Sequence, residues 1–340
     1  MPLGSKIADV SVGLLTGVTR RRVLTGAAAV CAAPLSATAA PRGYPGDLPV
    51  KIIVGFPAGG SQDNMGRIIA DRLAAYWGAS VVVENIAGAG SNIAFDRVAK
   101  GPTDGTQILI VPPGLATNQF LYSKLAFDPE RDLIPLALVA TFPNLLCVRN
   151  TLPVNTMAEF IAYAKANEGK LNYGSTGIGT TPHLASEMLK RMAGIDYATV
   201  HYRGSAPAVN DLLTGAVDMV IDNTTSVASH ARAGSVRALG ISTLRRWPLA
   251  TDFVPIADTV PGFEALAFTG IAVRAGTPRD ICDRIEAAVT AICKEKVLMD
   301  RMSQLAAEVV GSGSRDFSRF LNNERTKWGR LITDLRIRVG

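Results

Sequence analysis

Two glycine-rich loops are the segments of this sequence whose residue types and spacing could do chemistry. The first follows a β-branched run at residues 50–54 and precedes a helical pattern at residues 64–76. Its glycines let a ligand approach the main chain, and the first N–H groups of a helix lack partners within that helix. Such a terminus attracts anions. We therefore predict a ligand-binding loop made of Phe56, Pro57, Ala58, Gly59, Gly60 and Ser61.

The second loop, at residues 172–183, repeats this design. Thr181 is the expected N-cap of the next helix, with Pro182 at its first position. Either loop alone is better explained as a structural turn. Two such loops facing each other across a cleft would offer backbone donors and hydroxyls, at about 1.5 to 3 kcal/mol for each hydrogen bond to a charged acceptor. The predicted contributors here are Ser175, Thr176, Gly177, Gly179 and Thr180.

Polar residues at the ends of predicted strands are further candidates. Asp222 and Asn223 close the strand predicted at residues 217–221, and Asn118 follows another strand. Ligands of α/β proteins bind outside the carboxyl ends of strands, so we expect these residues near a cleft, with helix capping as an equal alternative for Asn118. His183 opens a helix, where packing is preferred to a chemical role. Asp63 is expected to cap or fix the first loop.

Motifs for catalysis and for metals are weak in this sequence. Residues 88–93 carry the first two glycines of a dinucleotide fingerprint without the third, and Glu84 imitates its acidic residue. A Rossmann-like NAD-dependent oxidoreductase therefore stays open as an alternative. No phosphate-binding P-loop and no hydrolase elbow is present. The three histidines lack a metal-ligand spacing, so we predict neither a metal nor a cofactor, and no enzyme.

The N-terminus has the pattern of an export signal. Three arginines at residues 20–22 precede an apolar stretch at residues 24–33 and the small residues 37–39. We predict a signal peptide at residues 1–39, of the twin-arginine type in preference to an ordinary secretory signal. Cys31 would be removed with it. The predicted location of the mature protein is the periplasm.

The charge balance argues against nucleic acid as the main partner. The chain has 35 basic and 29 acidic residues. Removal of residues 1–39 leaves 31 basic and 28 acidic residues, a net charge of +3. So small an excess, without basic runs, is compatible with a small anionic ligand. The remaining cysteines are too few for a disulfide framework and are expected to be buried: Cys147, Cys282 and Cys293.

Short β-branched runs alternate with helical patterns, which predicts an α/β fold with parallel strands. The length suggests two domains. No linker separates them, so we expect the chain to cross between them more than once, with apolar runs at residues 133–148 and 266–273 as the crossings. The predicted division assigns residues 44–146 and 268–340 to a discontinuous first domain and residues 147–267 to a second.

Taken together, these segments resemble the extracytoplasmic solute receptors of tripartite tricarboxylate transporters, the Bug or TctC family. The resemblance runs from about residue 44 to residue 332, and the order and spacing of its motifs are specific. These motifs are Pro57-x-Gly59-Gly60-Ser61-x-Asp63, Val83-Glu84-Asn85-x-x-Gly88-Ala89-Gly90, Asp104-Gly105-Thr106, Tyr173-Gly174-Ser175-x-Gly177-x-Gly179-x-x-x-His183, Tyr202-x-Gly204-Ser205-Ala206-Pro207, Asp222-Asn223 and Ala275-Gly276-Thr277-Pro278.

The resemblance implies a Venus-flytrap fold of the type II periplasmic-binding-protein class, two α/β domains around a central cleft. It implies a carboxylate held by residues 56–61 and 174–180, with Tyr202 among the ligand contacts, and delivery to membrane permease subunits. The receptor is expected to be a monomer. His201 and residues 268–270 depart from the family pattern, so the ligand could be a di- or tricarboxylate or an aromatic acid. An alternative interpretation is that the protein presents its ligand to a periplasmic sensor and has no part in transport.

Overall fold

The computed structural model describes residues 43–339. The predicted signal peptide and Cys31 lie outside the described residues. The three cysteines within them are free and buried. Among the described helices, none is both long and apolar enough to cross a membrane.

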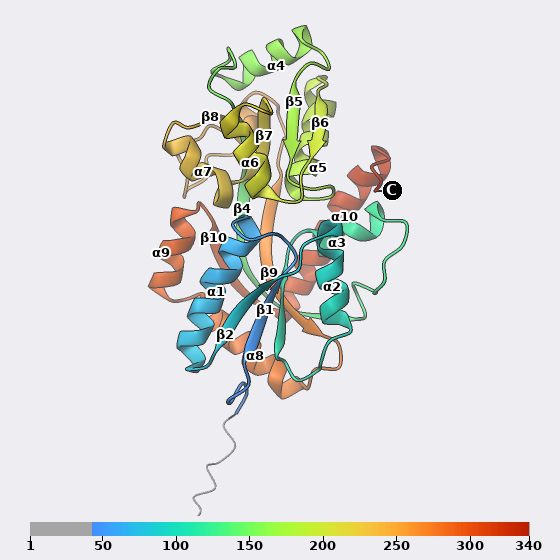
Figure 1. The fold of residues 1–340 in the computed structure, drawn as a ribbon, viewed down its shortest axis with the longest axis vertical. Coiled ribbons are helices and arrows are strands. Elements are labelled where there is room, and N and C mark those ends of the chain that lie inside the picture. Colours follow the sequence, from blue (N-terminus) through green and yellow to red (C-terminus); the bar gives the residue numbers. More distant parts are fainter. Residues whose placement is uncertain (1–42, 340) are drawn as a thin grey trace, which may run out of the picture. The chain divides into compact units, whose positions relative to one another are not determined.

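The strands form one mixed sheet in the order β2-β1-β3-β9-β4-β7-β5-β6, with β8 and β10 also paired to β4. Residues 133–143 of β4 pair with β9, and residues 144–148 pair with β7. This change of partner divides the sheet into a first half and a second half (Figure 1). Strand β4 (Leu133–Val148) belongs to both halves. The first half also contains β1 (Val50–Val54), β2 (Val81–Asn85), β3 (Gln107–Val111), β9 (Leu266–Arg274) and β10 (Glu308–Gly313). The second half also contains β5 (Asn172–Ser175), β6 (Ala198–His201), β7 (Met219–Asn223) and β8 (Arg237–Ile241).

Helices cover both halves of the sheet. Their apolar faces pack on the central strands, of which β1, β3 and β9 are almost wholly buried, as expected where a sheet is covered on both faces. The helices of the first half are α1 (Ser61–Trp77), α2 (Asn92–Ala99), α3 (Gly114–Leu121), α8 (Arg279–Ile292) and α9 (Lys296–Gln304). The helices of the second half are α4 (Met157–Ala166), α5 (Thr181–Ala193), α6 (Ser205–Thr214) and α7 (Thr224–Arg232). Two 3₁₀ turns, Ala89–Ser91 and Ile256–Asp258, lie in the connections.

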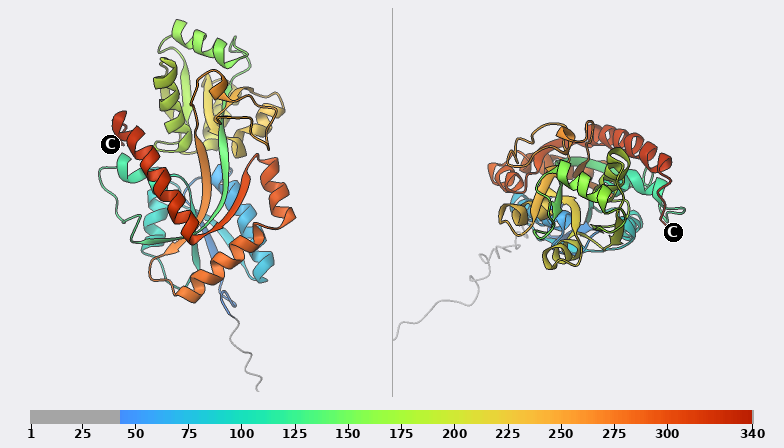
Figure 2. Two further views of the ribbon diagram at one scale, coloured as in Figure 1. Left: turned by 180° about the vertical axis from the view of Figure 1, so that it is seen from behind. Right: turned by 90° about the horizontal axis from the view of Figure 1, so that it is seen from above.

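The last helix, α10 (Ser314–Asp334), contributes to two hydrophobic cores. Phe317 and Leu321 are buried in a core built on the first half of the sheet. Trp328 and Ile332, further along the helix, are buried in a core with residues of the second half. Seen from the side opposite to that of Figure 1, the helix runs diagonally across the sheet (Figure 2). The assignment of residues 268–340 to one domain stays a prediction.

The predicted α/β class is confirmed. Residues 133–148 form a single strand, β4, while their role as a crossing between two domains stays a prediction. One cap is placed differently from the prediction. The N-cap of α5 is Thr180, whose hydroxyl accepts a hydrogen bond from the His183 N–H, so Thr181 is the first helical residue. Both threonines can cap a helix, and which of them does so depends on where the glycine-rich loop turns.

Candidate functional site

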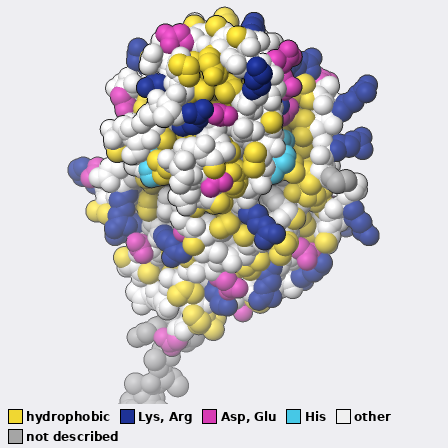
Figure 3. All heavy atoms as spheres, turned by 45° about the horizontal axis from the view of Figure 1, so that its top comes forward, with side chains coloured by type: hydrophobic (Ala, Val, Ile, Leu, Met, Phe, Trp, Pro, Cys, Tyr) yellow, Lys and Arg dark blue, Asp and Glu magenta, His cyan; other side chains and the backbone are white. Residues whose placement is uncertain are grey.

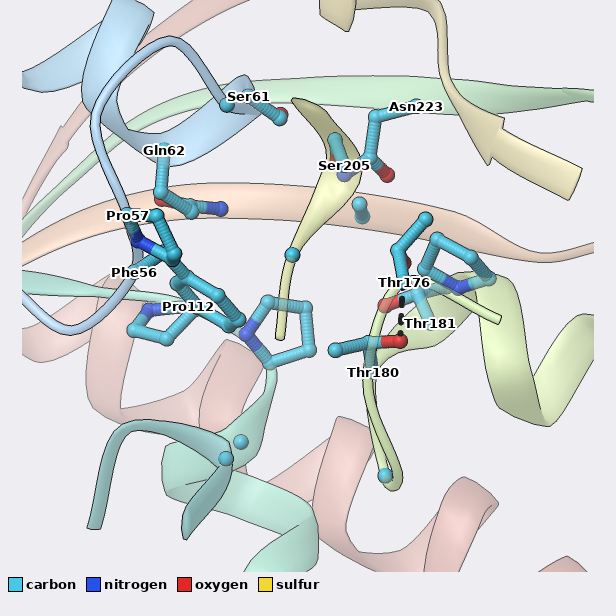
Figure 4. Close-up of a pocket in the computed structure, with 18 of the residues that line it drawn as sticks. Phe56, Pro57, Ser61, Gln62, Pro112, Thr176, Thr180, Thr181, Ser205 and Asn223 are labelled. Carbon is cyan, nitrogen blue, oxygen red and sulfur yellow. Dashed lines mark hydrogen bonds between the residues drawn. The ribbon is translucent and has the colours of Figure 1, made fainter. Parts of the chain in front are cut away.

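A narrow cavity lies where helix N-termini from both halves of the sheet meet. The loop after β1 and the loop after β5 face each other across it (Figure 4). The space open to the centres of water molecules is about 40 Å³, which exceeds what one water needs. The lining residues are Phe56, Pro57, Gly60, Ser61, Gln62, Gly90, Pro112, Pro113, Gly114, Thr176, Ile178, Gly179, Thr180, Thr181, Pro182, Gly204, Ser205, Ala206, Asn223 and Ala267.

The wall of this cavity has an unusual electrostatic composition. It contains the first residues of α1, α5 and α6 and the N-cap residue of α7. A helix N-terminus carries a partial positive charge and unpaired N–H groups. None of the described residues that line the cavity is Asp, Glu, Lys, Arg or His. Positive potential here comes from backbone dipoles, which suits a small anion.

The first loop is fixed by a buried carboxylate. Asp63 accepts hydrogen bonds from the Gly59 N–H at 2.8 Å, from Arg67 Nε at 2.9 Å and from Asn85 Nδ2 at 2.9 Å. Burial alone would raise the pKa of Asp63, but these hydrogen bonds and the Arg67 charge outweigh it and lower the pKa. The loop is held with Gly59 at φ +80°, and the predicted role of Asp63 in fixing the loop is confirmed.

The second loop is fixed by uncharged partners. Thr180 Oγ1 donates to the Gly177 carbonyl at 2.7 Å, and the Gly179 N–H donates to His183 Nδ1 at 3.2 Å. His183 is buried, and its ring contacts that of His201 at a centroid distance of 5.6 Å. Burial, with smaller effects of His201 and Lys190, lowers the pKa of His183 to about 4. The imidazole is therefore neutral near pH 7 and positions the loop.

Several buried polar atoms of the second half have no hydrogen-bond partner among the described residues. Thr181 Oγ1 and Asn223 Oδ1 belong to residues that line the cavity. Ser175 Oγ and Thr224 Oγ1 are buried close to them in sequence. A buried polar group without a partner costs about 1 to 3 kcal/mol, so these atoms mark a place where a ligand or ordered water completes the structure.

The two halves of the molecule also meet beside the cavity. Ser61 Oγ lies 2.5 Å from Thr225 Oγ1, and Asn64 Nδ2 donates to the Thr225 carbonyl at 3.3 Å. These bonds join the N-terminus of α1 to that of α7. The Ser61 hydroxyl, predicted as a ligand donor, is thus engaged in a contact between helices.

Eight of the sequence-predicted residues line the cavity: Phe56, Pro57, Gly60, Ser61, Thr176, Gly179, Thr180 and Asn223. Eight others lie outside its wall: Ala58, Gly59, Asn118, Ser175, Gly177, His183, Tyr202 and Asp222. Of these, Asn118 Nδ2 donates to the Gly90 carbonyl at 2.9 Å and to Asn92 Oδ1 at 2.7 Å, which fixes a neighbouring loop. Tyr202 donates to Asp211 at 2.5 Å.

A second, wider cavity adjoins the first. The space open to water centres in it is about 630 Å³. Phe56, Gly90, Thr176 and Ile178 line both cavities and form the partition between them. The wider cavity is also lined by Gly177 and Tyr202, and by His201 and Arg203, so a charged side chain is available only beyond the partition.

The other twelve lining residues were not predicted as ligand contacts, and they include two clusters in addition to Gln62, Gly90, Ile178, Thr181, Pro182 and Ala267. Gly204, Ser205 and Ala206 open α6 directly after β6, the same strand, glycine and helix order that marked the other two loops. That signal was present in the sequence and could have identified them. Pro112, Pro113 and Gly114 lie at the start of α3, whose first residue is Gly114. They carry no polar side chain that could have marked them as ligand contacts.

An α/β fold in which one strand runs through both halves of the sheet, and in which helix N-termini close on an uncharged cavity, defines a solute-binding receptor. The model of the tripartite tricarboxylate transporter receptor family, TctC, matches residues 65–337. The chain belongs to this family, whose members are receptors and not enzymes. The oxidoreductase alternative is therefore wrong. Among the described residues no cluster of His, Cys, Asp and Glu could hold a metal.

Relatives and solved structures agree with this assignment. A UPF0065 protein from the tcbD-tcbE intergenic region of Pseudomonas sp. strain P51 is 37% identical over 95% of this chain and 96% of its own. The structure of R. palustris Rpa4515 with adipate matches at 34% identity and TM-score 0.83, over 86% of this chain and 98% of that one. The structure of the periplasmic binding protein BugD matches at 31% identity and a TM-score of 0.82, over 86% of this chain and 99% of that one. The structure of MatC from Rhodopseudomonas palustris with bound malate matches at 29% identity and a TM-score of 0.77, over 84% of this chain and 98% of that one. The predicted fold class is confirmed.

Proposed function

We propose that this protein is a periplasmic receptor that captures a small carboxylate and delivers it to the membrane subunits of a tripartite tricarboxylate transporter. The observation that carries the proposal is the cavity itself. Helix N-termini and the unpartnered Thr181 hydroxyl line it, and no charged side chain of the described residues does. A carboxylate would replace the missing partners of these groups. The adipate in Rpa4515 and the malate in MatC support this ligand class.

The proposed contacts come from both halves of the molecule. Backbone N–H groups at Gly60 and Ser61 would face the carboxylate from one side, and the Thr176 and Thr181 hydroxyls from the other (Figure 4). A few bonds to a charged acceptor, at about 1.5 to 3 kcal/mol each, less the cost of association, correspond to micromolar binding.

The wider cavity would accommodate the rest of the ligand. It begins at the partition formed by Phe56 and Ile178 and includes His201 and Arg203. Arg203 is exposed and offers the planar, bidentate geometry that carboxylates prefer. A longer ligand with a second anionic group would suit this arrangement better than a short monocarboxylate. On the face shown in Figure 3, acidic side chains lie among the basic ones.

A thermal-shift screen of residues 40–340 tests the binding proposal. The ligands are succinate, malate, citrate, glutamate, adipate, benzoate, terephthalate and nicotinate, with NAD as the comparison. A ligand at 100 times its Kd stabilises the native state by about 2.7 kcal/mol. A shift with at least one acid is expected, and silence from all of them would refute the proposal.

A pair of variants ties such a shift to the cavity. Thr181→Val removes an unpartnered hydroxyl from the wall while keeping the shape of the side chain. It should weaken carboxylate binding about tenfold, as expected for one bond to a charged acceptor. Thr251→Val, at an exposed position outside the wall, is the control and should bind normally. Equal affinities of the two variants would place the ligand elsewhere.

Delivery and location need cellular measurements. Deletion of the gene should abolish uptake of the ligand that the screen identifies. If the deletion strain keeps normal uptake but loses a transcriptional response to the ligand, the sensor-partner function is favoured instead.

Cell fractionation tests the location and should find the mature protein in the periplasm. Replacement of Arg20 and Arg21 by Lys should block export if the twin-arginine route is used.

A further inference from the structure

A buried carboxyl group lies directly behind the wall of the narrow cavity. Asp222, at the carboxyl end of β7, is 0% exposed. Its Oδ1 accepts hydrogen bonds from Ser205 Oγ at 2.9 Å and from the Asn223 N–H at 2.7 Å. Ser205 and Asn223 both line the cavity (Figure 4). One hydroxyl group therefore separates Asp222 from the place where a ligand carboxylate would bind.

Asp222 has no charged partner. Its second carboxyl oxygen, Oδ2, lacks any hydrogen bond among the described residues. A buried carboxylate in this situation favours its neutral form, and burial raises the pKa of Asp222 to about 7, against a smaller opposing effect of its two hydrogen bonds.

The elements packed against β7 supply no compensating cation. Arg149 is paired with Asp218, Arg232 with Asp252, and Lys190 with Asp196. Burial, and secondarily the Asp222 carboxylate, raises the pKa of the Cys147 thiol. Burial, then Tyr197 and to a lesser extent Asp222, raises the pKa of the Tyr173 phenol, so both groups stay neutral. No hydrogen bond or ion pair joins Asp222 to any titratable or charged group on the elements packed against it. These groups are Cys147 on β4, Arg149 just after β4, Tyr173 on β5, His183, Glu187, Lys190 and Arg191 on α5, Asp211 on α6, His230 and Arg232 on α7, and Asp218 just before β7.

The charge on Asp222 decides what Ser205 can offer to a ligand. When Asp222 is ionised, the single Ser205 proton is donated to Asp222, and only lone pairs of Ser205 Oγ remain for the cavity. A ligand carboxylate there would lie about two hydrogen-bond lengths, roughly 5 Å, from a second carboxylate. When two carboxylates share a site, one of them is driven to take up a proton.

Protonation reverses the direction of the Ser205 hydrogen bond. After rotation about its Cβ–Cγ bond, a neutral Asp222 can donate its proton to Ser205 Oγ while its other oxygen still accepts from the Asn223 N–H. The Ser205 proton is then free to point at the ligand. The balance of this step is one proton taken from solvent by Asp222, with no other bond made or broken.

We propose that Asp222 is a positioning residue that takes up one proton when a carboxylate enters the cavity, and that this proton converts Ser205 into a hydrogen-bond donor toward the ligand. The inference rests on the proposed carboxylate-binding function and adds a proton to the binding reaction.

The direction of the pH dependence follows from linkage. A ligand that binds together with a proton binds most tightly on the acid side, and its Kd rises by up to tenfold for each pH unit above the pKa of the free receptor. Aliphatic carboxylates are fully ionised above pH 6.5. The pKa values of His183 and His201 are lowered mainly by burial, so both are largely neutral there. Of these groups only Asp222 changes charge as the pH rises from 7 to 8.5.

Isothermal titration calorimetry with adipate and malate tests the proposal on the protein without residues 1–39. Kd is measured at pH 7.0 and 8.5, each in two buffers that differ in ionisation enthalpy, which yields the number of protons taken up. We expect Kd to rise about tenfold between the two pH values, with net proton uptake at pH 8.5. A constant Kd without proton uptake would overturn the proposal.

Variants distinguish this role from a structural one. Asp222→Asn keeps the shape and removes the charge, so Kd should become independent of pH and, at pH 8.5, be lower than that of the wild type. Asp218→Asn, four residues earlier, is the matched control and should keep the wild-type pH dependence. An Asp222→Asn protein that still shows the tenfold change would contradict the proposal. If this variant does not fold, the number of protons that the wild-type protein takes up on binding decides whether the proposal holds.

The outcome also separates this inference from the proposed function. Carboxylate binding that does not depend on pH would remove the role of Asp222 and leave the receptor function intact. Absence of binding by adipate, malate and every other acid of the screen, at either pH, would remove both.

Discussion

The two glycine-rich loops look alike in sequence but are held in place by different physics. In the first, a carboxylate and a guanidinium form the support: Asp63 receives the Gly59 N–H and is paired with Arg67. In the second, the partners are a neutral imidazole and a hydroxyl, since the Gly179 N–H donates to His183 and Thr180 caps the helix.

The difference shows how one site can combine a rigid wall with available donors. The support of the first loop is ionic and complete, and its Ser61 hydroxyl is engaged with Thr225. The second loop leaves the hydroxyls of Ser175 and Thr181 without partners. If the proposed function is right, the first loop contributes mainly shape and backbone dipoles, and the second contributes hydroxyls that would donate hydrogen bonds to the ligand.

The largest effect is expected from Gly179→Val in the second loop. Gly179 has φ +80°, and a Cβ there would lie 2.3 Å from Cδ1 of the buried Leu121. Left-handed strain of about 1 to 2 kcal/mol adds to overpacking of about 1 to 3 kcal/mol. We expect about 3 kcal/mol lower stability in urea unfolding and loss of carboxylate binding. Gly194→Val, with φ +61° and open space around the Cβ, is the control for strain alone. Equal losses in the two variants would show that the contact with Leu121 is unimportant.

Asp63→Ala removes the support of the first loop and is expected to cost about 2 kcal/mol. The Gly59 N–H would lose its acceptor and Arg67 its partner, and hydrogen bonds to charged groups contribute about 1.5 to 3 kcal/mol. Because the folded-state pKa of Asp63 is lowered, its contribution is present above the unfolded value near 4 and disappears as the pH falls through the folded value. Urea unfolding at pH 7 measures the loss. Asp71→Ala, on the same helix with an exposed ion pair to Arg301, should change stability by less than about 1 kcal/mol. An equally mild effect of Asp63→Ala would mean that the first loop holds without its carboxylate.

The neutral support of the second loop should fail at a milder acidity. The pKa of His183 is lowered to about 4 in the folded protein, so the unfolded chain binds the proton more readily and stability is lost as the pH falls from about 6.5 toward 4. Between pH 7.5 and pH 5 this amounts to about 2 kcal/mol.

His183→Gln isolates that effect while keeping an acceptor for the Gly179 N–H. Asp222, whose pKa is raised to about 7, titrates in the opposite sense over the same interval and stabilises the fold as the pH falls. The measurement is therefore the difference between wild type and His183→Gln in urea unfolding at pH 7.5 and pH 5. An identical pH dependence of the two proteins would show that His183 does not carry the titration.

The sequence predicted the two loops well because their signal is local. A strand, a glycine pair and a helix start within a dozen residues determine where such a loop lies. The opening of α6 at Gly204 and Ser205 has the same order, but its polar residues are few and were not recognised as a site. Which hydroxyls are free could not be predicted, because the engagement of Ser61 depends on Thr225, 164 positions away.

The roles of the residues behind the wall also depended on long-range packing. Asn118 was predicted near the cleft from its strand-end position, with helix capping as an equal alternative, and its side chain holds the Gly90 loop, which lines both cavities. The burial of Asp222 follows from strand pairing with β4 at Leu145. β10 was not expected as a strand, because its residues 308–313 contain two glycines and only two apolar positions.

Helix α10 has a consequence for how the molecule melts. Its buried side chains belong to two cores, with Phe317 in one and Trp328 in the other. If the core of one half unfolds, the apolar side chains that α10 buries in that core become exposed. The helix is then destabilised, and so is its packing in the core of the other half. The described part of the chain should therefore unfold in a single all-or-none step, with equal calorimetric and van't Hoff enthalpies, even though its binding cavity lies between two halves.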